Sequence, residues 1–274
     1  MQFANESRIL VENISLQSGF LKREVKINIY LPRHVAEPSQ MNLLLNNDGQ
    51  NMEELRLDSI LEQLYAHQAI EPLLCVAIHA GRERKMEYGI ASRPDYKGRG
   101  AKAGLYTSFV MDELIPYIRK TYKLPLFREK AFAGFSLGGL SAMDIAWSHP
   151  GEFKKVGVFS GSFWWRSIDQ TEDEYDDDKH RIMHQSVRDG QYFPGLKFFF
   201  QCGNMDETKD RNKNGIIDSI DDTLDLVKEL IAKGYESEKD IYYTEMKDGR
   251  HDIATWARAM PEFLKWGWGK VKSK

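Results

Sequence analysis

A serine between two glycines is the residue of this sequence best placed to do chemistry. The segment Gly134-Phe135-Ser136-Leu137-Gly138 matches the pattern G-x-S-x-G, in which a strand turns sharply into a helix with the serine at the apex. The glycines remove side chains that would collide with the chain on either side of the strained serine. Residues 130–135 are typical of a strand and residues 137–148 of a helix, as the pattern requires. The sequence therefore predicts that Ser136 is a nucleophile.

A serine hydroxyl becomes nucleophilic when a base takes its proton and a carboxylate orients that base. In folds with this turn the chain order is serine, then acid, then histidine. Four histidines follow Ser136, and His251 lies between the last expected strand and the last expected helix. That is where a sheet of parallel strands places its site. The acid is expected after the preceding strand, where we predict Asp206, with Glu207 as its rival.

The same chemistry requires two N–H donors that stabilise the oxyanion of the reaction intermediate. One is expected from the backbone of Leu137, directly after the nucleophile and at the start of a helix. The other is expected from the loop after the first buried parallel strand, residues 46–51. Gly49 permits a tight turn there, and we predict Gln50 as the second donor.

A second pattern, at residues 210–221, indicates metal binding. Oxygen-bearing side chains occupy loop positions one, three, five, nine and twelve, and Gly215 at position six permits a sharp turn, as in an EF-hand calcium loop. Asp221 replaces the usual glutamate at position twelve, which is similar to the dockerin variety. The alternative is a polar loop whose Asp221 or Asp222 caps the next helix. We expect a structural Ca²⁺ that stiffens the segment presenting Asp206, with ligands from Asp210, Asn212, Asn214, Ile216, Asp218 and Asp221.

The elements that must position these residues alternate between strand and helix. Strands are predicted by apolar runs at 8–17, 22–32, 43–45, 73–80, 130–135, 156–159, 196–202 and 241–246. The first two of these strands are expected to form an opening hairpin. Helices are predicted by apolar spacing at 53–69, 106–122, 137–148, 222–233 and 253–266, where Pro261 could kink the last one. This alternation predicts one α/β domain over residues 1–274, with a mostly parallel sheet covered on both faces.

Residues 163–195 interrupt the alternation and predict an insertion that forms a lid or rim. Its acidic run, residues 169–178, is typical of a solvated surface. Trp164 and Trp165 are different, because two aromatic side chains close to a strand end could line a substrate pocket. We therefore predict both as substrate-binding residues.

The composition excludes some partners. The chain has 274 residues, 42% of them hydrophobic, and a formal net charge of -3, so nothing favours a nucleic-acid partner. The N-terminus does not resemble a signal peptide, and no apolar run approaches the roughly 20 residues needed to span a bilayer. We expect a cytoplasmic protein, although a secreted protein trimmed of its signal would look the same. Cys75 and Cys202 fall on separate expected strands, so a disulfide is not expected.

Taken together, these segments resemble the esterase family of α/β-hydrolases, which includes esterase D, feruloyl esterases, enterochelin esterases and mycolyltransferases. The likeness spans nearly the whole chain and is carried by residues 29–32, 48–50, 113–118, 134–139, 160–165, 202–206 and 249–256. It implies an α/β-hydrolase fold, a Ser-His-Asp triad and a backbone oxyanion hole at Gln50 and Leu137. Arg250 stands where such sequences often have a second glycine, which could alter the pocket.

The function that we predict is hydrolysis of a carboxylic ester through an acyl-enzyme. The expected substrate is a small molecule or carbohydrate-linked ester, such as a feruloyl or acetyl carbohydrate ester or a siderophore-type ester. Two alternatives stay open: acyl transfer to a sugar hydroxyl by the same residues, and a non-catalytic, calcium-dependent binding module. We expect no organic cofactor and no membrane partner.

Overall fold

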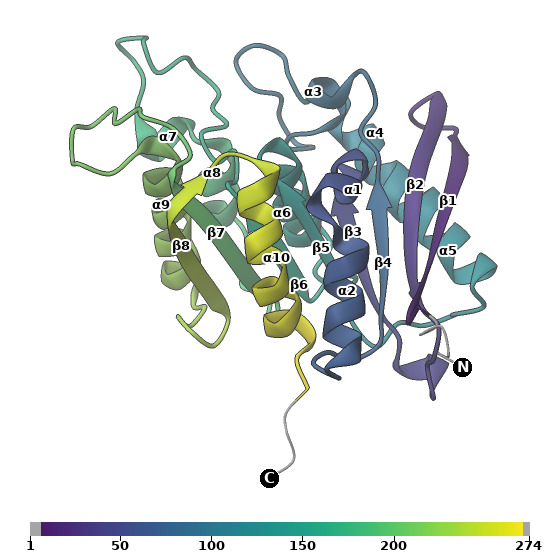
Figure 1. Cartoon of the computed structure of the whole chain (residues 1–274). Helices are drawn as coiled ribbons and strands as arrows, with labels where there is room; N and C mark the ends of the chain where they lie inside the picture. The colour runs from purple at the N-terminus through teal and green to yellow at the C-terminus, as the bar shows by residue number, and fades with distance from the viewer. Residues whose placement is uncertain (1–6, 271–274) are drawn as a thin grey trace.

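The computed structural model of the protein describes residues 7–270, and its core is one eight-stranded sheet (Figure 1). The strand order is β1-β2-β4-β3-β5-β6-β7-β8. The strands are β1 Ile9–Ser18, β2 Arg23–Pro32, β3 Asn42–Asn47, β4 Leu73–Ile78, β5 Lys130–Phe135, β6 Lys155–Phe159, β7 Lys197–Met205 and β8 Ile241–Arg250. β1 and β2 form an antiparallel hairpin, β2 also pairs antiparallel with β4, and the remaining pairs are parallel. The mostly parallel sheet is therefore confirmed.

Helices cover both faces of this sheet, which explains the continuous apolar runs in its central strands, such as residues 43–45 of β3 and all of β4. On one face lie α1 Met52–Leu55, α2 Leu57–Ala66 and α10 Ile253–Trp268. The other face is covered by α4 Ala103–Ser108, α5 Ile115–Thr121, α6 Leu137–Ser148, α8 Ile182–Asp189 and α9 Asp218–Lys233. Every residue of β3 and β4 is buried, whereas the edge strand β1 alternates between partly buried and exposed residues.

Three helices differ from their predicted extents. The helix expected at 53–69 is divided into α1 and α2 at Arg56, whose φ of 59° is left-handed. The helix expected at 106–122 contains a π-helical stretch, η3 Phe109–Leu114, just before Pro116. Pro116 has no N–H group to donate to an α-helical turn, which accounts for the irregular hydrogen bonding there. α9 begins at Asp218, four residues earlier than expected, because the last part of loop 210–221 is already helical.

The insertion at 163–195 is more closely integrated than a lid would be. It contains the short helix α7 Asp177–His180 and α8. The apolar side chains of α8, Ile182, Met183 and Val187, are buried in the same core cluster as α6 and α9. The acidic stretch at 169–178 lies at the surface, in a loop that Figure 1 shows extending beyond the carboxyl ends of the strands. Only this first part of the insertion therefore lies where a rim was expected.

The remaining short elements connect these layers. They are α3 Arg84–Glu87 and the 3₁₀ turns η1 Pro38–Gln40 and η2 Gly49–Asn51.

Within residues 7–270, none of the helices combines the length and the apolar character needed to cross a membrane. Cys75 and Cys202 are buried and free, and burial raises the pKa of both thiols. A raised pKa keeps a thiol protonated and unreactive.

Candidate active site

Ser136 occupies the sharp turn between β5 and α6 that its glycine pattern predicted. Its backbone angles, φ 53° and ψ −122°, lie in a region that residues with a side chain rarely adopt. A Cβ at Gly134 would lie 2.4 Å from the carbonyl carbon of Gly138, and one at Gly138 would lie 2.6 Å from Oδ2 of Asp48. Only glycine fits at these two positions, so the strained turn depends on both.

The hydroxyl of Ser136 is half-buried and faces a second hydroxyl. Ser136 Oγ lies 3.3 Å from Ser162 Oγ. The backbone of the turn is fixed from the same side, because the N–H of Ser162 donates to the carbonyl of Ser136 at 3.2 Å. Ser162 was not predicted as a site residue. The signal that could have found it is its place directly after β6, the strand next to the one that ends at Ser136.

His251 lies between the end of β8 and the start of α10, as predicted. Asp252 caps the helix by accepting the N–H of Thr255 at 2.8 Å, and the imidazole of His251 packs edge-on against Trp256 with ring centroids 5.4 Å apart. Partial loss of hydration lowers the pKa of His251 below its ordinary value, and the charge of Arg84 acts in the same direction. The nearby carboxylate of Asp206 opposes this shift. A lowered pKa keeps the imidazole neutral, as a general base must be.

Asp206 directly follows β7, and the two oxygens of its carboxylate differ in their hydrogen bonding. Its Oδ2 accepts the N–H of Gly203 at 3.1 Å. Its Oδ1 is buried and has no well-formed hydrogen bond in the described chain. Burial raises the pKa of Asp206, whereas the N–H of Gly203, the hydroxyl of Ser160 and a positive charge on His251 act in the opposite direction. The side chain thus lies close to the Ser160 hydroxyl and interacts electrostatically with His251.

Glu207, the rival acid, lines the same cavity but has different neighbours. Burial raises the pKa of its carboxyl, and the charge of Asp218 raises it further. The N–H of Ser219 and the charge of Lys209 act in the opposite direction. The main charges that act on His251 are instead those of Asp206, Arg84 and Asp252. Of the two acids, Asp206 is therefore the one whose charge is felt by the imidazole.

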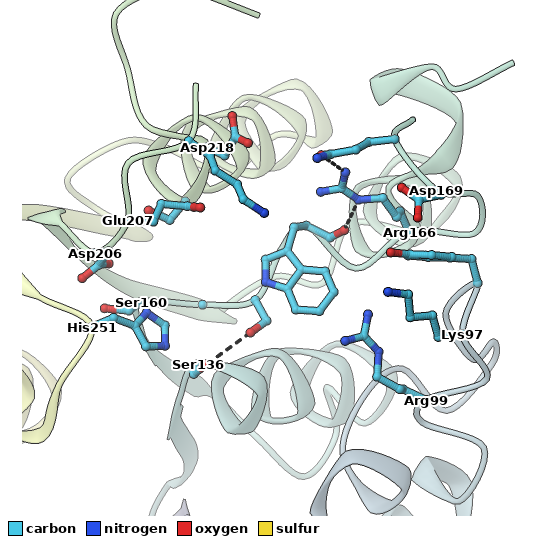
Figure 2. Close-up of a pocket in the computed structure, with 17 residues that line it drawn as sticks. Lys97, Arg99, Ser136, Ser160, Arg166, Asp169, Asp206, Glu207, Asp218 and His251 are labelled. Carbon is cyan, nitrogen blue, oxygen red and sulfur yellow. Dashed lines mark hydrogen bonds between the residues drawn. The ribbon is translucent and has the colours of Figure 1, made fainter. Parts of the chain in front are cut away.

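One cavity of about 370 Å³ brings Ser136, Asp206 and His251 together (Figure 2). Figure 2 shows the imidazole of His251 close to Ser136, with Asp206 beyond it on the same side of the cavity. Within residues 7–270, no hydrogen bond joins His251 to either of the other two side chains. The three segments nevertheless converge at the carboxyl ends of β5, β7 and β8.

The two residues predicted as oxyanion donors differ in their surroundings. Leu137 is the first residue of α6, so its N–H has no acceptor within the helix. Gln50 is exposed in η2, and its side-chain amide bonds to Asp48 Oδ1 at 3.0 Å and to the N–H of Ala80 at 2.9 Å. Neither residue is part of the cavity wall.

The turn before Gln50 is built differently from the prediction. Asp48, not Gly49, has the left-handed backbone, with φ 62°. Gly49 is required by close approach to β4, because a Cβ there would lie 2.5 Å from the carbonyl oxygen of Ala77. Arg84 holds the turn in place through two bonds to the carboxylate of Asp48, at 2.7 and 2.8 Å.

The two tryptophans predicted to bind substrate, Trp164 and Trp165, lie in different environments. Trp164 is half-buried and lines the cavity. Trp165 is 0% exposed and packs against Gly89 and Gly100, where a Cβ would come within 2.7 and 2.8 Å of its ring. The prediction that Trp165 contacts substrate is therefore wrong for this structure, because two glycines distant in sequence create a core site for it.

Several cationic residues line the cavity that the sequence did not identify. They are Lys97, Arg99, Arg166 and Lys209. Lys97 and Arg99 belong to the connection between β4 and α4, where no periodic pattern or motif indicated a functional role for them. Charged residues in such loops are ordinarily solvated, so only the folded chain reveals their convergence.

The loop at 210–221 brings part of its predicted calcium ligands together. Asp210 accepts the N–H groups of Asn214 and Gly215 at 3.1 and 2.9 Å. Asp221 Oδ2 accepts the side-chain amides of Asn212 and Asn214 at 2.6 and 3.2 Å. Gly215 has a φ of 87°, so the sharp turn occurs at the predicted position.

Asp218 and Ile216 lie less centrally in this loop. Asp218 Oδ1 accepts the N–H of Arg211 at 2.8 Å, and its side chain reaches the wall of the cavity. Ile216 is exposed.

Across residues 7–270, no group of three or more histidine, cysteine, aspartate or glutamate side chains is arranged to hold a metal ion. The converging atoms of this loop instead come from two aspartates and two asparagines. The N-cap of α9 is Ile217, so neither Asp221 nor Asp222 caps that helix.

Comparison with known proteins gives a family and two curated relatives. The model of the family described as "Putative esterase" matches residues 18–266. The uncharacterized protein YbbA of Bacillus subtilis is 24% identical over 155 residues, which cover 53% of this chain and 60% of YbbA. The uncharacterized protein YjcH of the same organism is 20% identical over 249 residues, which cover 89% of this chain and 92% of YjcH.

Solved structures agree over nearly the whole chain. A ferulic acid esterase has a TM-score of 0.69 at 20% identity, covering 95% of this chain and 98% of its own. The enterobactin esterase of Shigella flexneri, solved with enterobactin, has a TM-score of 0.70 at 21% identity, covering 94% of this chain but only 58% of its own. An IroE-like serine hydrolase from Shewanella oneidensis has a TM-score of 0.68 at 19% identity, covering 93% and 80%. These likenesses confirm the α/β-hydrolase fold.

Proposed function

Because the chain belongs to the esterase family and is a carboxylic ester hydrolase, we propose that it cleaves small-molecule esters through an acyl-enzyme on Ser136. His251 is the general base, and Asp206 orients its imidazole. The observation that carries this proposal is the meeting of the three side chains on one cavity, where the charge of Asp206 acts on the imidazole of His251.

In the first half of the reaction, Ser136 Oγ forms a bond to the ester carbonyl carbon while its proton passes to His251. The bond to the alcohol oxygen then breaks, and His251 gives that oxygen the proton. In the second half, water attacks the acyl carbon, and its proton passes through His251 to Ser136 Oγ as the carboxylic acid leaves. The backbone N–H groups of Leu137 and Gln50 stabilise the oxyanion in both halves.

The test is hydrolysis of p-nitrophenyl acetate by the whole chain and by Ser136→Ala. Ser148→Ala is the matched control, because Ser148 is an exposed serine at the far end of the same helix. We expect Ser136→Ala to lose about 10³-fold or more of kcat while Ser148→Ala retains it. Equal activity of wild type and Ser136→Ala would refute the assignment. Feruloyl and catecholate esters belong in the subsequent substrate panel, because similar structures are named as ferulic acid and enterobactin esterases.

We further propose that the loop at 210–221 binds Ca²⁺. Asp210, Asn212, Asn214 and Asp221 supply side-chain oxygens, Ile216 a carbonyl, and Asp218 a ligand at the position often bridged by water. The convergence of the first four residues supports this. The side-chain oxygens of Asn212 and Asn214 lie inside the same loop, where they accept the backbone N–H groups of Asn214 and Ile216 at 3.1 and 2.8 Å. Bound Ca²⁺ would supply positive charge that fixes the chain just after Asp206.

A further inference from the structure

The two sides of the active-site cavity carry opposite charge. Figure 2 shows Lys97, Arg99 and Arg166 on the side away from His251, and Asp206, Glu207 and Asp218 on the side of His251. Lys209, which also lines the cavity, lies close enough to Glu207 to influence its pKa. One wall is therefore mainly positive and the other mainly negative.

Arg166 is the best-placed cation of the positive wall. The residue is only 6% exposed, and no carboxylate of the described chain lies within ion-pair distance of it. Its charge nevertheless reaches the buried Asp222, where it opposes the burial that raises the pKa of that carboxyl. Its Nε donates to the carbonyl of Trp164 at 2.7 Å, its Nη1 bonds to Gln170, and its guanidinium lies over the ring of Tyr175. A buried cation without a contacting anion is costly, so an anion that entered the cavity would be stabilised there.

Lys97 and Arg99 complete this wall in different ways. Lys97 is exposed, lies 5.2 Å from the ring centroid of Tyr96, and forms no ion pair at contact distance within residues 7–270, although its charge helps to lower the pKa of Asp169. Arg99 pairs with Asp95 through a 2.6 Å bond, and its guanidinium lies 4.8 Å from the ring centroid of Trp164.

One carboxylate, that of Asp169, lies on the same side of the cavity as these cations and partly offsets their charge. Asp169 accepts the N–H of Thr171 at 3.2 Å, and this bond lowers the pKa of Asp169, so it stays charged. Asp95 is already neutralised by Arg99. Asp222, which also feels the charge of Arg166, is already paired with Arg181 and Arg211. With Lys97, Arg99 and Arg166 set against Asp95 and Asp169, the wall therefore keeps an excess of positive charge.

The position of His251 decides which half of an ester meets this wall. His251 must deliver a proton to the departing alcohol oxygen, so the alcohol lies on its side of Ser136. The acyl chain then extends to the other side, toward Lys97 and Arg166. Trp164 lines the same cavity, with its ring under the guanidinium of Arg99. The indole offers apolar contact to the carbon chain, and the cations offer charge to whatever ends it.

We propose that the enzyme selects esters whose acyl group ends in an anion such as a carboxylate, bound by Lys97 and Arg166 across Trp164. This inference rests on the proposed function of Ser136 and His251. Hydrolysis adds the hydroxyl group of water to the acyl carbon and a proton to the alcohol oxygen, so the products are a free alcohol and a dicarboxylic acid.

The experiment compares two p-nitrophenyl esters with six-carbon acyl chains, the acid-ended adipate and the neutral hexanoate. We expect the wild-type chain to show a kcat/KM at least about fivefold higher for the adipate ester. Lys97→Met keeps most of the carbon stem but removes the charge, so the ratio of the two kcat/KM values should fall toward one. Lys120→Met, an exposed lysine on α5 away from the cavity, is the matched control and should keep the wild-type ratio.

A second pair of esters places the charge on the alcohol instead, using the acetate ester of 6-hydroxyhexanoate and hexyl acetate. We expect no preference for the charged member of this pair. A wild-type ratio near one in the first pair, an unchanged ratio in Lys97→Met, or a preference for charge on the alcohol would each overturn the inference while leaving the serine esterase intact. If wild type hydrolyses none of the four esters faster than Ser136→Ala, the proposed function itself fails.

Discussion

The hydroxyl oxygens of Ser136 and Ser162 lie 3.3 Å apart on the wall of the cavity. Most O–H···O hydrogen bonds are shorter, so this contact is a weak one that steadies the resting position of the nucleophile. We expect Ser162→Ala to lower kcat/KM for p-nitrophenyl acetate by about two- to tenfold, the range of a lost neutral hydrogen bond. The melting temperature, measured in parallel, should change little. A loss as large as that of Ser136→Ala would mean that Ser162 performs the attack.

The two neighbouring carboxylates after β7 can be separated by matched amide substitutions. Asp206→Asn removes the charge that His251 senses and leaves an amide beside the imidazole, so we expect kcat to fall by about 10³–10⁴-fold. Glu207→Gln is the control, because the carboxylate of Glu207 interacts with Asp218 and Ser219 instead. It should retain kcat within a few-fold. The reverse pattern in steady-state assays would make Glu207 the acid.

The pH dependence of the reaction should report His251. Its pKa is lowered below about 6.5, and only the neutral imidazole can take the proton of Ser136. Therefore kcat/KM should stay level from pH 8 down past pH 6.5 and fall only as the pH drops through the lower pKa. The carboxylate of Asp206 favours the protonated imidazole of His251. An NMR titration of Asp206→Asn should therefore show that the pKa of His251 is lower than in the wild type. A midpoint above 6.5 in the wild-type profile would contradict this environment for the imidazole.

The sequence predicted features that depend on local patterns. The turn at Ser136 depends on Gly134 and Gly138, because a Cβ atom at these positions would lie only 2.4 and 2.6 Å from neighbouring atoms. The parallel sheet follows from apolar runs such as residues 43–45 and 73–78, since strands buried on both faces favour continuous apolar stretches over alternation. In both cases the determining residues are neighbours in the chain.

The sequence could not predict features that depend on distant contacts. Trp165 is buried because Gly89 and Gly100, far from it in sequence, leave room for its ring. Lys97 and Arg166 share one wall because two long connections meet above the sheet, and loop residues carry no periodic signal of that meeting. The break at Arg56 likewise reflects tertiary packing, since no glycine or proline marks it.

Removal of calcium should weaken both the fold and the catalysis. The loop at 210–221 begins four residues after Asp206, and its Arg211 bonds to Asp177 of the insertion at 2.9 Å and to Asp222 of α9 at 2.7 Å. Calcium at a hundredfold excess over its Kd would stabilise the fold by about 2.7 kcal/mol. At about 2–4 °C per kcal/mol for a chain of this size, a chelator should lower the melting temperature by about 5–10 °C. Activity should fall with it, because the carboxylate of Asp206 loses its rigid support.

Asp210→Asn is the control variant for this experiment, because Asp210 occupies the first ligand position. Its two oxygens accept the N–H groups of Asn214 and Gly215 separately, and the single amide oxygen of asparagine can keep one of these bonds. We expect this variant to melt at or below the chelated wild-type temperature and to respond to neither chelator nor added calcium. Differential scanning calorimetry and the p-nitrophenyl acetate assay, run on the same samples, measure both effects. If the chelator leaves the wild-type melting temperature and activity unchanged, the loop holds its shape through its own Asp210 and Asp221 hydrogen bonds and no ion is needed.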